Sequence, residues 1–407
     1  MALGNRTNEN KINTLPTHFL PMAAAGFASM VSMRLCDAML PALATDFSTT
    51  TGRAAGVISY FVIAYGVLQL VYGAIGARIG KPRLIALAAT LSMGVNLALA
   101  LAGNLDALFI LRAVAGGIAA AIIPTTLAHL GDTVPYEQRQ PVLANYMSAT
   151  ITGGIIGQWT GGILTDTLGW PSAFLLMTLV FGVAAWSLRA LLFQPIQRPA
   201  DGVPSGFLAQ IAGTLSGGWA RLIITIVFFE GAIVFSGIVF IPSYLHNQFN
   251  VPLTWAGAIV ALYGIGGLGY TFFARRLLAR FGEQGLAVGG GVMMGLGFIL
   301  LVLGNHWAWS LPSCLASGFG FYMMHNTLQT NATQMAPQTR GTAVALFASS
   351  LFLGQAVGIA AVAAIIDQFG PIVAFAISAA SLPLLGWLFS VRLRKRHHSP
   401  ASTQSLS

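Results

Sequence analysis

The sequence predicts an all-α integral membrane protein with twelve transmembrane helices in two parallel repeats of six. Of the 407 residues, 56% are hydrophobic and only 8% are charged, and the mean hydropathy is +0.75. Soluble domains carry about 25% charged residues, so this composition excludes an ordinary cytosolic enzyme. Apolar stretches of about 20 residues, the length of a bilayer-crossing helix, recur along the chain. A shift of 201 or 202 residues also brings scarce proline, arginine and aspartate residues into register.

The apolar stretches define twelve expected spans and the segments between them. A helix satisfies its own backbone hydrogen bonds in lipid, and the alternating pattern of a barrel strand is absent, so we expect helices. The spans are residues 18–44, 56–76, 84–103, 108–130, 142–164, 171–192, 222–245, 256–273, 286–303, 309–331, 341–366 and 371–393. The expected domains are an N-terminal tail (1–17), two six-helix bundles (18–193 and 222–393), a connector (194–221) and a C-terminal tail (394–407). The first span is too long for a signal-peptide core, so we expect no cleavage.

The first expected span contains two charged side chains, Arg34 and Asp37, followed by Pro41. A charge near the bilayer centre costs about 2.5 to 3.5 kcal/mol, so each needs a partner or a task. Arg112 in the fourth span is expected at the same depth as Asp37, on a helix of opposite direction. Asp37 therefore has two candidate partners, because Arg34 lies one turn away and can share its helix face. A static buried ion pair is the alternative to a working proton site.

Two glycine-containing motifs stand out in the first half. The loop after the second span reads Gly-Ala-Ile-Gly-Ala-Arg-Ile-Gly-Lys-Pro-Arg, from Gly73 to Arg83. The fifth span carries Gly153, Gly157, Gly161 and Gly162, with Gln158 between them. Small residues at such spacing let helices approach closely, which is the structural interpretation of each glycine.

Scarce proline, arginine and aspartate residues of the first half recur at matching positions in the second half. Pro41 matches Pro242, Arg139 matches Arg340, and Asp166 matches Asp367. The two aspartates end the fifth and eleventh spans at the outer face, and their repeat symmetry favours a structural task. The connector between the halves is rich in proline and glycine, so we interpret it as a tether.

The second half has polar side chains in its seventh and tenth spans. Glu230 lies near the middle of the seventh span, without a basic residue nearby in that helix. It is interpreted as a second proton site or as an anchor for a cationic substrate; the alternative is a neutral acid bonded to a backbone carbonyl. His325, Asn326 and Gln329 recur at helical spacing in the tenth span. His325 is either a titrating group or an ordinary hydrogen-bonding group.

The basic residues predict the orientation of the chain. With the N-terminus in the cytoplasm, Arg53 is the one basic residue in an outer loop, and those outside the spans otherwise fall at cytoplasmic ends. This is the positive-inside bias, and it makes both termini cytoplasmic. The net charge of +9 therefore reports topology rather than a nucleic-acid partner. Cys36 and Cys314 lie within apolar spans, so neither a disulfide framework nor a metal site is expected.

These motifs resemble the major facilitator superfamily over nearly the whole chain, and within it the twelve-span drug:proton antiporters of the bicyclomycin and chloramphenicol resistance type. The resemblance implies that substrate binds between two rocking halves. It also implies a gating motif at Gly73, Arg78, Gly80, Lys81 and Arg83, and an antiporter motif at Gly153, Gly157, Gly161 and Gly162. Ala77 replaces the family's Asp and Gln158 replaces its Pro, which leaves the usual latch and the direction of transport open.

We therefore expect a proton-coupled exporter of small organic compounds in the bacterial inner membrane. The expected proton-coupling residues are Asp37, Arg112, Arg34 and Glu230. The expected substrate-cavity residues are Tyr65, Gln158, Tyr263, His325, Asn326 and Gln329. Protons, lipid and a small-molecule substrate are the expected partners of a monomer that uses no cofactor or metal and binds no nucleic acid. An importer or facilitator is the alternative; an embedded enzyme or sensor lacks a nucleophile with a base.

Overall fold

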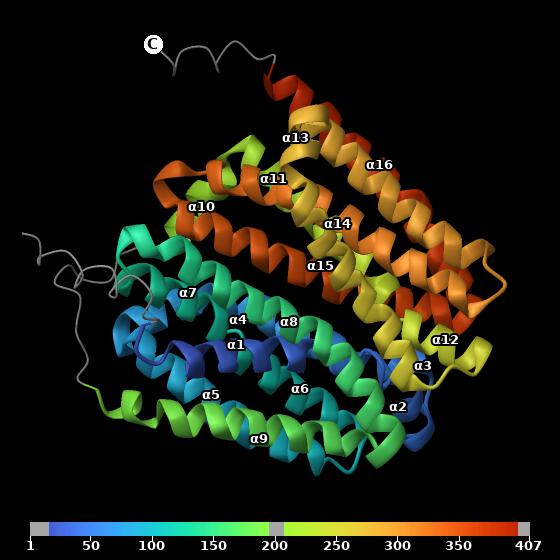
Figure 1. Ribbon diagram of the computed structural model, residues 1–407, viewed down its shortest axis with the longest axis horizontal. Coiled ribbons are helices and arrows are strands. Elements are labelled where there is room, and N and C mark those ends of the chain that lie inside the picture. The colour runs from blue at the N-terminus through green and yellow to red at the C-terminus, as the bar shows by residue number, and fades with distance from the viewer. Residues whose placement is uncertain (1–15, 195–206, 398–407) are drawn as a thin grey trace, which may run out of the picture.

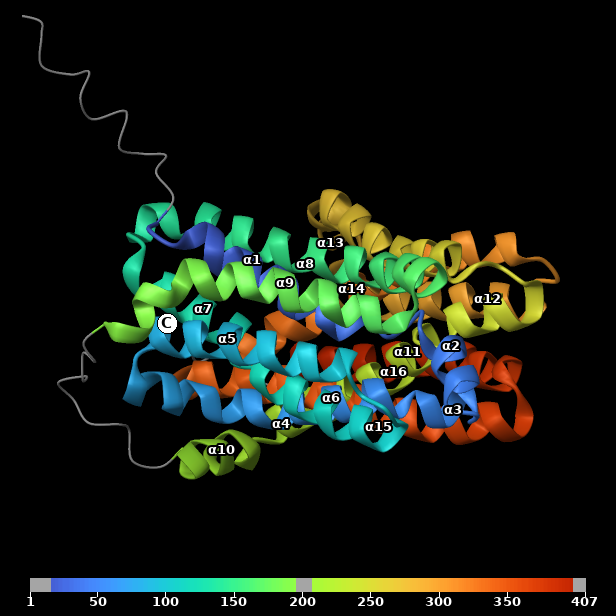
Figure 2. The same cartoon turned by 90° about the horizontal axis from the view of Figure 1, so that it is seen from below.

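The computed structural model describes residues 16–194 and 207–397, and no strand occurs in these two ranges (Figure 1). Residues 1–15, 195–206 and 398–407, and with them Arg6, Lys11 and Arg198, lie outside the described residues. Most helices run nearly along one common direction (Figure 2). Eight of them are long and apolar enough to cross a membrane. The chain is therefore a multi-pass membrane protein.

The first group of helices comprises nine α-helices. They are α1 (Phe19–Arg34), α2 (Leu40–Asp46), α3 (Thr51–Ala54), α4 (Gly56–Ile79), α5 (Lys81–Ala100), α6 (Leu105–Ala119), α7 (Ile122–Thr133), α8 (Tyr136–Leu168) and α9 (Trp170–Leu188), followed by a 3-10 turn (Arg189–Phe193). Within this group α1 packs on α8 and α9, α4 on α6, and α5 on α9.

The second group comprises six α-helices preceded by a short one. They are α11 (Gly218–Ile238), α12 (Ile241–Phe249), α13 (Leu253–Leu303), α14 (Ser310–Gln334), α15 (Arg340–Phe369) and α16 (Pro371–His397), and the short helix is α10 (Phe207–Ser216). Single 3-10 turns (Trp307–Trp309 and Pro337–Thr339) precede α14 and α15. Here α13 packs on α14 and α16, and α11 packs on α15.

Three expected spans are interrupted rather than continuous, which corrects the sequence interpretation. The span 18–44 is broken at residues 35–39, between α1 and α2, and similar breaks separate α6 from α7 and α11 from α12. Each break precedes a proline, namely Pro41, Pro124 and Pro242. Proline has no N–H to donate to the carbonyl four residues earlier, so the helical bonding cannot continue through it.

Two pairs of glycines set the ends of helices. Gly80 and Gly282 have φ of 89° and 64°, and Gly169 and Gly370 have φ of 81° and 83°. Glycine adopts this left-handed region without the steric penalty of a side chain. Gly282 interrupts α13, which contains both expected spans 256–273 and 286–303. The members of each pair are separated by the same offset as the repeated sequence motifs.

The described part of the connector contains a docked helix, α10. The amide oxygen of Gln210 in α10 accepts a hydrogen bond from Thr342 Oγ1 at 2.8 Å. The hydroxyls of Thr214 and Thr339 lie 3.2 Å apart. These contacts fix α10 against the first turn of α15.

The two groups meet along four pairs of helices. Helix α13 lies on α8, α15 on α4 and α3, and α12 on α2. We call the end of the molecule that carries α2, α3 and α12 the distal end, and the end with α10 the termini end. In Figure 1 the two groups meet near the distal end, and their ribbons diverge toward the termini end.

Candidate functional site

Asp37 lies in the break between α1 and α2, where its side chain is fully buried. Its Oδ2 atom is 3.7 Å from Nη1 of Arg34 and accepts a hydrogen bond from Nε2 of Gln158 at 3.4 Å. Its Oδ1 atom has no hydrogen-bond partner among the described residues. Pro41 creates the break, so the same backbone feature that interrupts the span positions the acid.

Arg112 in α6 is held by main-chain carbonyls. Its Nε atom donates to the carbonyl of Val57 at 2.9 Å, and its Nη1 atom donates to the carbonyl of Ser32 at 3.0 Å. The guanidinium carbon lies 4.0 Å from the ring centroid of Phe61. Arg112 therefore joins α6 to α1 and α4. Of the two candidate partners of Asp37, Arg34 makes the ion pair.

The Arg34 guanidinium also reaches the second group of helices. Its carbon lies 4.5 Å from the ring centroid of Phe235 in α11. The Arg34 side chain is 11% exposed. A single side chain thus contacts the acid in its own group and an aromatic ring of the other group.

Glu230 in α11 is paired with His325 in α14. Nδ1 of His325 lies 2.7 Å from Oε2 of Glu230, whose side chain is fully buried. The imidazole stacks on Phe321, with centroids 4.8 Å apart, and lies 5.2 Å from the ring of Phe347. Both residues had been identified separately from the sequence, but not as a pair. The feature of the sequence that could have suggested the pair is that each residue is an isolated polar group in an apolar helix.

The other expected cavity residues occupy different environments. Tyr65 is buried and its ring lies 4.9 Å from that of Phe352 in α15, across the contact between the groups. Tyr263 is buried, and its hydroxyl has no partner in the described part of the chain. Asn326 is half-buried and Gln329 is exposed, and in the described residues neither side chain is hydrogen-bonded to Glu230 or His325.

The glycines of the fifth expected span lie where helices approach closely. A Cβ atom added at Gly153, Gly157 or Gly161 would be 2.0–2.8 Å from a carbonyl oxygen of α1 or of the residue after it. A Cβ added at Gly162 would be 2.1 Å from the carbonyl oxygen of Leu253, in the second group. Three glycines therefore allow α8 to pack on α1, and the fourth allows α8 to pack on α13.

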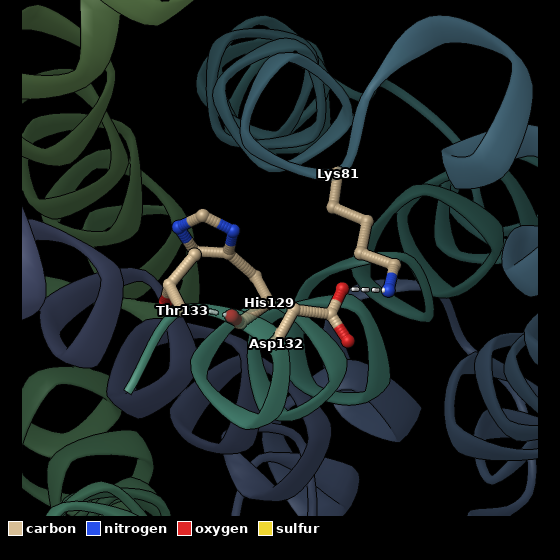
Figure 3. A network of polar contacts seen from close by, with 4 residues as sticks. All are labelled: Lys81, His129, Asp132 and Thr133. Carbon is tan, nitrogen blue, oxygen red and sulfur yellow. Dashed lines mark hydrogen bonds and ion pairs between the residues drawn. The ribbon is translucent and has the colours of Figure 1, made fainter. Parts of the chain in front are cut away.

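The loop motif lies at the termini end, where Lys81 pairs with Asp132 near the end of α7 (Figure 3). The pair joins two helices of the first group, α5 and α7. The acid was not identified from the sequence; its proximity to the motif depends on how α7 returns beside α5. Arg78 is exposed and Arg83 half-buried, and neither makes an ion pair with a described residue.

The two repeat-related aspartates both bond across the distal end. Asp166 in α8 accepts hydrogen bonds from the amide and the hydroxyl of Thr254, at 2.7 and 2.8 Å. Asp367 in α15 accepts from the Thr50 hydroxyl at 2.6 Å and from the Gly52 amide at 3.0 Å. Each aspartate therefore binds the start of a helix in the opposite group.

Metal-binding side chains do not gather in the described ranges. No three His, Cys, Asp or Glu side chains of residues 16–194 and 207–397 come together in a group that is able to hold a metal ion. The buried residues of these ranges include two carboxyl groups, Asp37 and Glu230, and each lies beside a basic side chain.

Comparison with known proteins identifies a family. The family described as Major Facilitator Superfamily matches residues 22–358. The chain is 25% identical to the uncharacterized MFS-type transporter YwfA of Bacillus subtilis (strain 168), covering 96% of this chain and 97% of that protein. It is 29% identical over 157 residues to the probable multidrug resistance protein EmrY of Escherichia coli (strain K12), which is 39% of this chain but only 31% of that protein.

Solved structures show the same fold. A mutant of the nucleoside transporter NupG superposes with a TM-score of 0.77 at 13% sequence identity, covering 92% of this chain and 99% of that chain. An identity this low supports a shared fold and nothing about the substrate. The matching family and the similar proteins named here are transporters, so the chain is a transporter and not an enzyme.

Proposed function

Because the chain belongs to the Major Facilitator Superfamily and is a transporter, we propose that it exports small organic compounds in exchange for protons. One observation carries the proposal. Asp37 is a buried acid in a helix break, and its countercharge Arg34 also contacts the opposite group of helices. A charged side chain is costly to place in a membrane, so a buried intramembrane acid is a candidate for a function such as proton exchange. Discontinuous helices are where transporters of this architecture bind their coupling ions.

The proposed architecture has twelve spans in two parallel repeats, residues 18–193 and 222–393, joined by the connector 194–221. The breaks before Pro41 and Pro242 and the paired glycines with positive φ support the repeat. The proposed orientation has both termini in the cytoplasm of a bacterial cell and the distal end outside, in agreement with the positive-inside bias. The close contacts at the distal end then correspond to a state closed to the outside.

In the proposed cycle, Asp37 binds and releases the proton while the two groups rock between inward and outward access. Arg34 is its countercharge, Gln158 donates to the carboxylate, and Arg112 fixes the helices around it. Glu230, buried against His325, is the proposed second site, where a cationic substrate binds. Tyr65 and Tyr263 border the substrate between the groups, and a single chain performs the cycle.

Export is favoured over import by the names of relatives. EmrY is a probable multidrug resistance protein, and the multidrug export protein EmrB of Haemophilus influenzae is 25% identical over 155 residues. These alignments span about 30% of each relative, so they support the class of transport and not a particular compound. Ala77 and Gln158 depart from the family motifs that are associated with gating and antiport. Import is therefore the alternative outcome of the test.

The test is accumulation in bacterial cells that overproduce the protein, with cells carrying the Asp37→Asn variant as control. The probes are ethidium, a lipophilic cation, and chloramphenicol, which is neutral. Export predicts lower accumulation of at least one probe than in the control, and an uncoupler that collapses the proton gradient removes the difference. Higher accumulation in the overproducing cells contradicts export and supports import. Glu230→Gln is expected to weaken the transport of ethidium but not of chloramphenicol.

A further inference from the structure

The aromatic ring of Phe235 is the point at which the second group of helices touches the charge pair of the first. Phe235 lies in α11, and Arg34 and Asp37 lie at the end of α1 and in the break that follows it. We propose that Phe235 is a positioning residue for Asp37: it holds the Arg34 guanidinium, so that the Arg34–Asp37 pair depends on the contact between the two groups. This inference rests on the proposed function of Asp37 as the proton site.

The Phe235 ring is fixed in place by two aromatic neighbours. Its centroid lies 5.4 Å from that of Phe321 in α14 and 6.2 Å from that of Tyr263 in α13, both at steep interplanar angles. Edge-to-face pairs of this kind are favourable because the positive ring edge meets the negative ring face. The ring is 5% exposed. Phe235 is therefore a rigid surface of the second group rather than a mobile side chain.

The attraction between Arg34 and this ring is strong enough to compete with the ion pair. A guanidinium within about 6 Å of a ring centroid is attracted by the negative face of the ring, and the attraction is stronger when the cation is desolvated. Arg34 is 4.5 Å from the centroid and mostly buried. Its nearest approach to Asp37 is 3.7 Å, beyond hydrogen-bond range, and its Nη1 atom has no hydrogen-bond partner among the described residues.

The geometry makes the pair sensitive to movement between the groups. Asp37 and Arg34 move together because both belong to the first group, whereas Phe235 moves with the second. When α11 withdraws from α1, the guanidinium loses the ring and is free to close on the carboxyl group. An interaction can shift a conformational equilibrium only if its free energy differs between the two states. The contact between Arg34 and Phe235 meets this condition, because it is lost when α11 withdraws.

The other charged or titratable groups near the pair do not replace Phe235 in this role. Around the Asp37 carboxyl they are Cys36 and Arg112, which belong to the first group. Near the Arg34 guanidinium they are Tyr263 and Tyr322, and neither hydroxyl is hydrogen-bonded to Arg34 in the described part of the chain. Among the described residues of the second group, the aromatic face beneath the guanidinium is that of Phe235.

The experiment is an infrared titration of the purified protein in lipid, which needs no substrate. The carboxyl band of Asp37 is identified by its loss in Asp37→Asn, and its titration midpoint is compared among variants at Phe235. Phe235→Leu removes the aromatic face, and Phe235→Trp keeps it. Phenylalanine analogues with increasing fluorination at position 235 weaken the ring's attraction for a cation at nearly constant size. Phe298→Leu is the matched control, because Phe298 is fully buried in the same group without a cation over its ring.

The expected result is a midpoint lowered by about 0.5 to 1.5 pH units in Phe235→Leu, because the freed guanidinium closes on the Asp37 carboxylate and favours its ionised form. The displacement grows stepwise with fluorination, and Phe235→Trp and Phe298→Leu titrate like the wild type. An unchanged midpoint through the fluorinated series, or an Asp37 band that does not titrate, overturns the inference. Because the readout is independent of transport, a displaced midpoint in a protein that does not couple transport to protons leaves the inference standing and contradicts the proposed function.

Discussion

At the scale of single residues, the buried charges of this protein are few and each has a specific partner. Asp37 has Arg34, Glu230 has His325, and Arg112 has two main-chain carbonyls. An uncompensated buried charge is strongly destabilising, so these contacts explain how the charges are tolerated in lipid. Arg112 differs from the other buried charges because its contacts depend on the planar, forked shape of the guanidinium as well as on its charge.

The first prediction concerns the geometry of Arg112. Arg112→Lys keeps the charge but cannot donate in two directions while stacking on Phe61, so the folded state is expected to lose about 2 to 4 kcal/mol. The thermal unfolding temperature in detergent then falls by several degrees. Arg53→Lys is the matched control, because Arg53 and its partner Asp106 are 63% and 76% exposed. Equal unfolding temperatures for the two variants contradict this interpretation of Arg112.

Sequence reasoning identified the individual charges but could not determine their partners. A spacing of i, i+3 placed Arg34 near Asp37, because neighbours within one helix depend only on helix geometry. The Glu230–His325 pair spans 95 positions and depends on the rotation of two helices, which hydropathy does not encode. Phe235 was missed for a related reason, since one phenylalanine among 25 carries no signal until its neighbours are known.

At the scale of helices, glycine and proline determine what hydropathy alone could not. The expected spans coincide with helices, but the breaks after Arg34, Ala119 and Ile238 were not expected, because an apolar window does not register a missing N–H. The glycines of α8 were identified as a motif from their spacing. The structure adds that Gly162 differs from its neighbours in contacting the opposite group.

The second prediction separates two glycines of the same motif. Gly161→Ala brings a Cβ to 2.0 Å from the Leu35 carbonyl oxygen within the first group. It is therefore expected to cost about 1 to 3 kcal/mol and to lower the unfolding temperature. Gly162→Ala brings a Cβ to 2.1 Å from the Leu253 carbonyl oxygen. Because the two groups separate in the proposed transport cycle, that variant is expected to retain its unfolding temperature and to open at the distal end.

The control is Gly154→Ala on the same helix, whose Cβ would meet only the end of Met30 at 3.6 Å. Alanine stabilises a helix interior by about 0.5 to 1 kcal/mol relative to glycine, so this variant should unfold at or above the wild-type temperature. Thermal unfolding in detergent measures all three variants. A Gly162→Ala protein that unfolds as early as Gly161→Ala shows that the distinction between the two contacts is wrong.

At the scale of the whole molecule, a shift of 201 or 202 residues predicted a repeat, and structural features follow the same shift. Asp166 and Asp367 are one such pair, and each binds the start of a helix in the opposite group. The sequence indicated a structural task for them, but the partner segments could not be predicted. These contacts join segments 88 and 315 positions apart, so they depend on how the helices of the two groups pack, which the spacing of the aspartates does not encode.

The third prediction is that these two aspartates hold the distal end closed. A hydrogen bond to a charged group contributes about 1.5 to 3 kcal/mol, so removing both acceptors should shift the population toward an open distal end. Spin labels introduced by Ser48→Cys and Gln368→Cys report the distance across this end by electron paramagnetic resonance. Asp166→Ala with Asp367→Ala is expected to add a longer-distance population. Asp106→Ala, which changes an exposed distal acid within one group, should leave the distances unchanged; the same distribution in both proteins contradicts the prediction.

The central claim, that Asp37 couples transport to protons, is tested most directly in inverted membrane vesicles with an imposed proton gradient. Two quantities are measured for the wild type and for Asp37→Asn: uptake of ethidium against its gradient, and exchange of ethidium at equal concentrations without a proton gradient. The account predicts that the variant loses gradient-driven uptake and retains exchange, because exchange requires movement of the two groups but no net proton transfer. Full gradient-driven uptake by Asp37→Asn would contradict it.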